Sequence, residues 1–261
     1  DLNLDELKSQ IEIPELKLGF DMPQELENDS IDDAAKIKTD IKLGDLIEIG
    51  RHRLLCGDST KKEDVERLMN GKKADMVFTD PPYGINIVSG GKVGGDKSFG
   101  SVGTGNIVKA KNYPKIIGDN STEYAKLFYN ICVELGIENF IIWGGNYFTD
   151  FLYPSMGWII WDKENTGNKF ADCEIAWTSY QKATRLYKWL WNGMIRKGDV
   201  QLENNVRVHP TQKPVGLFQE IFNNYDFKIC LDGFLGSGST MVACQTLDRT
   251  CYGMELEPLY C

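Results

Sequence analysis

The chain has 261 residues, of which 42% are hydrophobic and 26% charged, and a formal net charge of −9 at pH 7. Its length and composition predict one large globular domain, and its apolar runs are far shorter than the ~20 residues that span a bilayer, so we expect a cytoplasmic protein without membrane contact. Seven scattered cysteines lack the paired spacing of a metal site or a disulfide framework, which predicts reduced thiols and no metal.

Residues 1–40 differ in composition from the rest. They hold twelve acidic residues against four lysines, so they carry most of the net charge. With Pro14, Pro23 and only a weak helical pattern over 31–37, this segment is interpreted as an acidic linker or peripheral arm. The sequence begins without Met, as expected of a fragment or a processed chain. Because the remainder is nearly neutral, the overall acidity does not exclude a nucleic-acid partner.

From residue 41 onward, short apolar runs alternate with helix-like segments. We expect strands at 53–56, 75–78, 140–143, 228–231 and 251–255, and helices at 62–69, 123–135, 215–222 and 240–247. This alternation predicts an α/β fold with a mostly parallel sheet and helices on both faces. Residues 174–179 resemble a strand of an antiparallel hairpin, which predicts one antiparallel edge.

Two stretches interrupt the alternation. Residues 84–105 are rich in Gly and Ser and are interpreted as a mobile loop. Residues 161–207 are aromatic and basic, and are long enough for an inserted subdomain. Its positive charges are either solvated or in contact with phosphate, and we retain as DNA-binding candidates Lys182, Arg185, Lys188, Arg196, Lys197 and Arg207.

The sequence FTDPPYGIN, residues 78–86, ends the second expected strand. Its prolines fit simple strand termination, since Pro donates no ladder hydrogen bond. They also form a rigid pair of acceptors, in which Asp80 and the Pro81 carbonyl can accept the two N–H groups of a planar amine. Pro82 stiffens the turn and Tyr83 offers a face for stacking on a ring.

Residues 231–247 combine a strand end, a glycine-rich turn and a helix start. Asp232 is followed by Gly236 and Gly238, and Ser239 or Thr240 is expected to cap the helix. Such a turn lets a backbone approach a cofactor closely, although it also serves as an ordinary connection.

Glu255 ends the next expected strand, about twenty residues after the glycines. It is either an exposed strand-end acid or an acceptor for both hydroxyls of a ribose. Together with the glycine turn, it favours a ligand that contains adenosine.

The segment VRVHPTQKPVGLF, residues 206–218, precedes an expected helix that begins at a proline. His209 has no partner that suggests a metal site and fits a hydrogen-bonded structural residue. Lys213 can neutralise a carboxylate, which an amino-acid-bearing nucleoside has and a nicotinamide dinucleotide lacks.

From residue 41 to its end, the chain resembles the S-adenosylmethionine-dependent DNA amino-methyltransferases. The resemblance rests on four motifs: DPPY at 80–83, HPTQKP at 209–214, FLGSG at 234–238 and the following Glu255. DPPY precedes the glycine motif, as in the β class, which implies a circularly permuted, Rossmann-like methyltransferase sheet. The chain has DGF where the family often has DPF, and it stops at Cys261, where the family implies a further helix.

The resemblance implies roles for individual residues. DPPY would hold the target amine, and Asp58 would contact the adenine of the cofactor, unless it only caps a helix that starts near Ser59. Lys213 and its neighbours would approach the methionine end, and residues of about 165–207 would read the DNA sequence. The implied cofactor-binding residues are Asp58, His209, Thr211, Lys213, Asp232, Phe234, Gly236, Gly238, Ser239, Thr240 and Glu255.

The function implied by the resemblance is methylation of the adenine N6 amine in a specific sequence of double-stranded DNA, after the base is flipped out, as in restriction–modification. Asp80 favours adenine, because cytosine-N4 enzymes more often have Ser at that position. Cytosine N4 stays open, as does a subunit of the same fold that binds nucleic acid without catalysis. A homodimer is compatible with the class, but no interface is legible.

Overall fold

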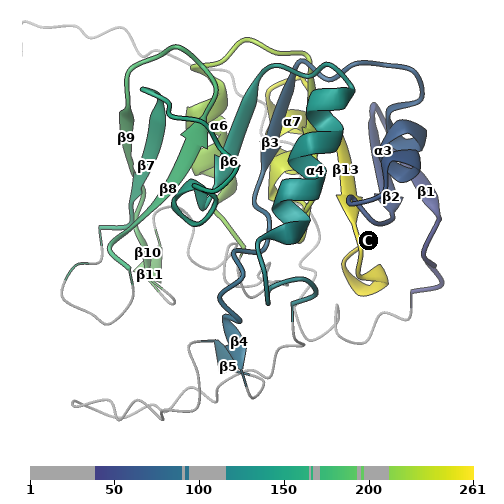
Figure 1. The fold of residues 1–261 in the computed structure, drawn as a ribbon, viewed down its shortest axis with the longest axis horizontal. Coiled ribbons are helices and arrows are strands. Elements are labelled where there is room, and N and C mark those ends of the chain that lie inside the picture. Colours follow the sequence, from purple (N-terminus) through teal and green to yellow (C-terminus); the bar gives the residue numbers. More distant parts are fainter. Residues whose placement is uncertain are drawn as a thin grey trace, which may run out of the picture.

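The computed structural model describes residues 39–89, 92–93, 116–164, 166, 171–192, 195–196 and 212–261 (Figure 1). The predicted arm of residues 1–40 therefore lies almost entirely outside the described residues. No helix among the described residues is long and apolar enough to cross a membrane.

One nine-stranded sheet organises the molecule, in the order β1-β2-β13-β12-β3-β6-β8-β7-β9. The four neighbouring pairs from β2 to β6 are parallel. The strands are β1 (Leu46–Ile49), β2 (His52–Cys56), β3 (Met76–Thr79), β6 (Phe140–Trp143), β7 (Trp158–Asp162), β8 (Cys173–Thr178), β9 (Arg185–Lys188), β12 (Ile229–Asp232) and β13 (Thr250–Glu255).

The predicted mixed sheet is confirmed. β8 runs antiparallel to both β6 and β7, which makes the expected antiparallel edge. At the other edge β1 pairs antiparallel with β2, a strand that the sequence reading did not include. Two short hairpins are formed by β4 (Val88–Ser89) with β5 (Lys92–Val93) and by β10 (Trp191–Asn192) with β11 (Ile195–Arg196).

Helices cover both faces of the sheet. In Figure 1, α3 (Lys62–Met69) and α4 (Glu123–Glu134) lie in front of it, and α6 (Val215–Phe222) and α7 (Ser239–Thr246) lie behind it. Two 3₁₀ turns complete the described elements, η1 (Gly145–Tyr147) and η2 (Pro258–Tyr260).

Alternation along the central strands builds two cores. Met76 and Phe78 of β3 pack in the cluster that includes α6 and α7, whereas Val77 between them packs with α3 and α4. Since successive side chains of a strand point to opposite faces, a strand buried on both sides needs a continuous apolar run, and all four residues of β3 are buried.

Within the predicted DNA-reading region of about 165–207, β8 and β9 are strands of the main sheet. Residues 197–211 lie outside the described residues, including Lys197, Arg207, His209 and Thr211.

Candidate active site

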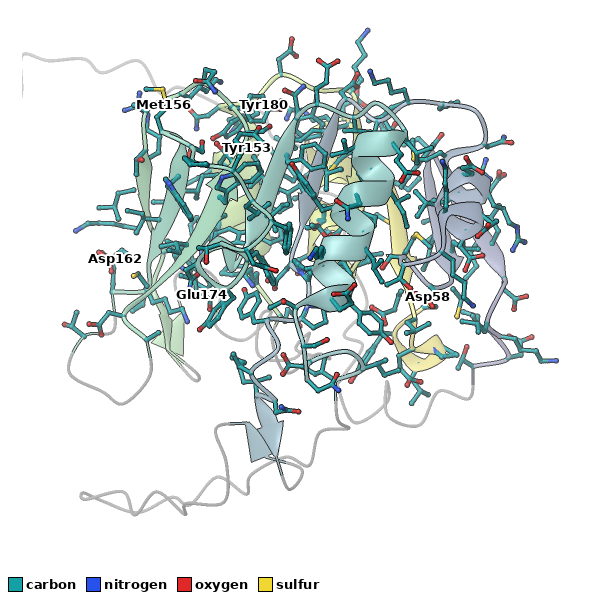
Figure 2. All side chains as sticks on the ribbon, viewed as in Figure 1. Asp58, Tyr153, Met156, Asp162, Glu174 and Tyr180 are labelled. Carbon is teal, nitrogen blue, oxygen red and sulfur yellow. The ribbon has the colours of Figure 1, made fainter. Side chains whose placement is uncertain are left out.

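The ends of the parallel strands bring the sequence motifs to one edge of the sheet. Asp58 follows β2, Glu255 ends β13, Asp232 ends β12 and Asp80 follows β3. Because these strands are adjacent and parallel, their carboxyl ends meet at the same edge, where open α/β sheets bind ligands. Figure 2 shows Asp58 and Glu174 towards this lower edge, and Tyr153, Met156 and Tyr180 at the opposite one.

The DPPY turn holds Asp80 in a defined orientation. The Tyr83 hydroxyl donates a hydrogen bond of 2.6 Å to Asp80 Oδ1. The Asp80 side chain keeps 23% of its surface exposed. Burial raises the pKa of Asp80, and Lys213 opposes that rise. Asp80 is therefore a partly accessible carboxylate with spare acceptor capacity, since an ionised carboxylate offers about four lone-pair sites.

Aromatic contacts fix the Tyr83 ring. Tyr147 of η1 stacks on it with 5.0 Å between ring centroids and 14° between planes, and Phe148 packs against it edge-on at 6.2 Å. Gly144 has φ of 70°, and a Cβ there would lie 2.2 Å from Tyr83 Cε1. Glycine is therefore required at 144 both by backbone conformation and by the closeness of the ring.

Lys213 lies in a different place from the one implied by the resemblance. Its side chain, 6% exposed, forms an ion pair with Asp80 Oδ2, and its Nζ lies 3.2 Å from Glu174 Oε2. Burial alone would lower the pKa of Lys213, but the two carboxylates raise it. The ammonium is thus engaged by protein carboxylates, which argues against the expected contact with the methionine carboxylate of a cofactor.

A hydrogen bond joins the catalytic strand to the glycine turn. The Thr79 hydroxyl donates 2.8 Å to Asp232 Oδ1, which also accepts the Phe234 N–H at 3.1 Å. Burial raises the pKa of Asp232 to about 6, despite these hydrogen bonds. Asp232 therefore ties the end of β12 to the end of β3.

The glycine turn has the conformation and the space that a cofactor needs. Gly236 and Gly238 have φ of 54° and 81°, and a Cβ at Gly238 would meet no atom within 4 Å. Glu255 Oε2 accepts the Gly236 N–H at 2.8 Å, so the predicted ribose acceptor borders the turn. Open backbone at the start of α7 beside a carboxylate fits an adenosine-containing ligand.

The expected helix cap at Ser239 or Thr240 is wrong. Gly238 is the N-cap of α7, and the Ser239 hydroxyl instead donates to the Lys213 carbonyl at 2.9 Å. A left-handed residue is needed where the turn enters the helix, and glycine supplies it at low steric cost.

Asp58 is not a helix cap. The helix begins at Lys62 with Lys61 as its N-cap, while Asp58 Oδ1 accepts hydrogen bonds from the Thr60 amide and hydroxyl at 3.0 and 2.6 Å. Gly57 N–H donates to the Glu255 carbonyl at 2.9 Å, so Asp58 follows a residue bonded to the predicted ribose acceptor.

The basic residues split between the two edges of the sheet. Arg185 pairs with Ile159 at the start of β7 and Lys188 pairs with Asp162 at its end, so only Lys188 reaches the edge of the candidate site. Lys182 Nζ donates 2.6 Å to the Asn224 carbonyl and lies 4.6 Å from the Tyr225 ring centroid.

Sequence reasoning missed Asp119, Tyr147, Lys163 and Glu174. Asp119 is buried, and its carboxylate accepts the N–H groups of Gly84, Ile85 and Ile87 at 3.0, 3.2 and 2.6 Å. No local pattern marks these residues, apart from the acid of Glu174 inside an otherwise apolar strand. No cluster of His, Cys, Asp or Glu able to hold a metal occurs in the described ranges.

A family model described as DNA methylase, N6_N4_Mtase, matches residues 74–261. The chain belongs to this DNA methylase family. The matched range contains the DPPY turn, Lys213, the glycine turn and Glu255, and leaves β1, β2 and Asp58 outside. The methyl donor of this methylase is S-adenosylmethionine, as the sequence predicts.

Curated relatives of the methylase carry restriction–modification names. It is 27% identical over 214 residues to the type II methyltransferase M2.MboI of Moraxella bovis, covering 70% of this chain and 76% of the relative. It is 25% identical over 228 residues to the type II methyltransferase M2.DpnII of Streptococcus pneumoniae, covering 74% and 81%.

Solved structures similar to the methylase include the M1.HpyAVI–SAM complex, with 22% identity and a TM-score of 0.45 over 79% of this chain and 94% of that one. The cytosine-N4-specific PvuII DNA methyltransferase has 13% identity and a TM-score of 0.48, covering 81% and 84%.

Proposed function

We propose that the methylase transfers a methyl group to the N6 amine of adenine in a specific sequence of double-stranded DNA. The observation that carries the proposal is the position of Asp80, at the end of β3 and joined through Thr79 and Asp232 to the glycine turn. Acceptors for an amine thus lie beside the part of the fold suited to the methyl donor.

Four groups have distinct roles in this proposal. Asp80 and the Pro81 carbonyl accept the two N–H groups of N6, and Tyr83 stacks on the flipped ring. Orientation of the amine lone pair supplies most of the catalysis. As the nitrogen becomes positively charged, the Asp80 carboxylate stabilises it, and the proton leaves afterwards.

The cofactor would be held by the turn at Gly236 and Gly238, with Glu255 on its ribose and Asp58 near its adenine. When bound, S-adenosylmethionine supplies the methyl group from a sulfonium centre. Asp232 keeps this turn against β3 through Thr79. Lys213 is assigned to Asp80 rather than to the cofactor, because its ammonium already pairs with two carboxylates.

The Tyr147 ring stacks on Tyr83, where the proposal places the target base, so base entry requires a rearrangement. Tyr147 is 42% exposed and lies on a short 3₁₀ turn. We propose that it shifts to admit the base and then covers its outer face. A ring held at 5.0 Å from Tyr83 leaves no space for a base between the two, since each stacked layer needs about 3.5 Å.

Cytosine N4 is the second candidate within the family, whose model covers both N6 and N4 enzymes. Asp80 favours adenine on the sequence grounds given above. A nucleic-acid-binding subunit without catalysis is less well supported, because the acceptor turn and the glycine turn are both intact.

The test is the Asp80→Ala variant, assayed for methyl transfer to DNA and for binding of S-adenosylmethionine. We expect methyl transfer to fall at least ~100-fold, while binding of the donor changes little, because Asp80 acts on the amine. Asp150→Ala removes an exposed carboxylate paired with Lys126 at 4.0 Å and serves as the matched control. Near wild-type transfer by Asp80→Ala would refute the proposal.

A further inference from the structure

Four alternating charges run from the catalytic turn to the antiparallel edge. Asp80 pairs with Lys213, Lys213 Nζ lies 3.2 Å from Glu174 Oε2, and Glu174 Oε1 lies 2.7 Å from Lys163 Nζ. The four residues come from the turn after β3, the residue before Pro214, β8 and the end of β7. Figure 2 labels Glu174 near the lower end of β8.

The position of Glu174 in the sheet explains why it faces the site. β8 lies beside β6 and runs in the opposite direction, so its first residues reach the edge at which β3 and β6 end. Glu174 pairs in register with Trp161 of β7, and its side chain is 26% exposed. An acid in this strand, which otherwise reads CEIAWT, has no packing reason to be there.

We propose that Glu174 is a positioning residue for methyl transfer, because it shares the Lys213 ammonium with Asp80 and so limits how much of the Asp80 charge Lys213 neutralises. The inference rests on the proposed role of Asp80 at the amine. It also assigns Glu174 and Lys163, which lie in a stretch expected to read DNA, to the support of the catalytic turn.

The electrostatic reason is the competition of two carboxylates for one buried ammonium. Lys213 satisfies both anions, and Lys163 balances the second one, so the four charges sum to zero. Without the Glu174 charge, Lys213 would pair with Asp80 alone and draw its carboxylate away from the amine. The developing positive charge on the amine would then be stabilised less.

The experiment measures the single-turnover rate of methyl transfer against pH, at saturating DNA and S-adenosylmethionine, in wild type, Glu174→Gln and Asp172→Asn. Asp172 is an exposed acid two residues away, so its variant removes the same charge from the same segment. We expect Glu174→Gln to lower the rate at neutral pH about ten-fold or more, and Asp172→Asn to leave it within two-fold.

The pH profile separates positioning from folding. The Glu174 charge raises the pKa of Asp80, so its removal should move the acidic limb of the profile to lower pH, by about half a unit or more. Asp232 titrates in this range as well, but all variants retain it. Fewer folded molecules would lower the amplitude without moving the limb.

Glu174→Asp keeps the charge one methylene further from Lys213 and should restore at least part of the rate and of the limb position. An acidic limb at the wild-type pH in Glu174→Gln, or a loss no greater than in Asp172→Asn, would overturn the inference. If Glu174→Gln fails to fold, a wild-type rate and limb in a double variant that lacks both Glu174 and Lys163, Glu174→Leu with Lys163→Met, would overturn it instead. The proposed function would stand in either case, since it depends on Asp80→Ala.

Discussion

Three buried or partly buried carboxylates around the site have different electrostatic surroundings. Asp232 has hydrogen-bond donors but no cation among its printed partners, and burial raises its pKa to about 6. Burial also raises the pKa of Asp80, where Lys213 opposes it. For Glu174, burial acts in the same direction but Lys213 and Lys163 outweigh it, so the pKa falls below its usual value. Neighbouring cations therefore decide which acids remain ionised.

Asp232→Asn tests this at one residue. A folded-state pKa of about 6, above the usual value for Asp, means that the native state binds the proton more tightly, so the Asp232 contribution to stability falls as pH rises from about 4 to 6. Asn keeps an acceptor for Thr79 and Phe234 without the charge. We expect the variant to gain roughly 2 kcal/mol relative to wild type at pH 7, and little at pH 4.

Urea unfolding of both proteins across this pH range measures the difference. A gain that does not change between pH 4 and pH 7 would contradict the account of Asp232, because only a titrating group gives a pH-dependent difference.

At the residue scale, local motifs identified Asp80, Tyr83, the glycines and Glu255, because each follows a predicted strand. The partners of Lys213 were not predictable, since Asp80 lies 133 positions earlier in the chain and only the sheet brings the two together. The resemblance therefore suggested a cofactor contact where the structure has an internal ion pair.

At the element scale, periodicity located the central strands and helices well. The helices at 62–69 and 215–222 and the strand at 140–143 have the predicted bounds, because apolar faces and flanking turn residues mark their ends. β1 and β9 were missed, since half-exposed edge strands carry little apolar pattern. The connection from Gly84 to Asp119 was also missed as a structured contact.

Asp119→Ala tests that connection. Three backbone N–H groups next to the DPPY turn lose their shared carboxylate, so we expect a loss of about 3 kcal/mol in the free energy of unfolding and a lower rate of methyl transfer. Asp119→Asn, which keeps one acceptor oxygen, should lie between the variant and wild type. Urea unfolding and the methyl-transfer assay measure both effects, and unchanged stability in Asp119→Ala would contradict the anchoring role.

At the scale of the whole molecule, the sheet places β3 next to β12 although the catalytic motif precedes the glycine motif in the chain. The sequence predicted this class of fold because strands and helices alternate, but not which edge each basic residue occupies. That depends on strand direction: β9 runs parallel to β7, which separates Arg185 from Lys188.

The two edges predict different effects on DNA binding. Lys188→Met, at the edge of the site, should weaken DNA binding and reduce the magnitude of the slope of log K against log salt by about 1, because one phosphate contact is lost. Lys182→Met, at the opposite edge, serves as the matched control and should leave the slope unchanged. Equal effects of both variants in a fluorescence-anisotropy titration at several salt concentrations would contradict this assignment.

The most direct test of the central claim is mass analysis of nucleosides from DNA incubated with the protein and S-adenosylmethionine. The account predicts N6-methyladenine as the product, and its near absence when Asp80→Ala replaces the wild type. N4-methylcytosine as the product, or no methylated base at all from the wild-type protein, would contradict it.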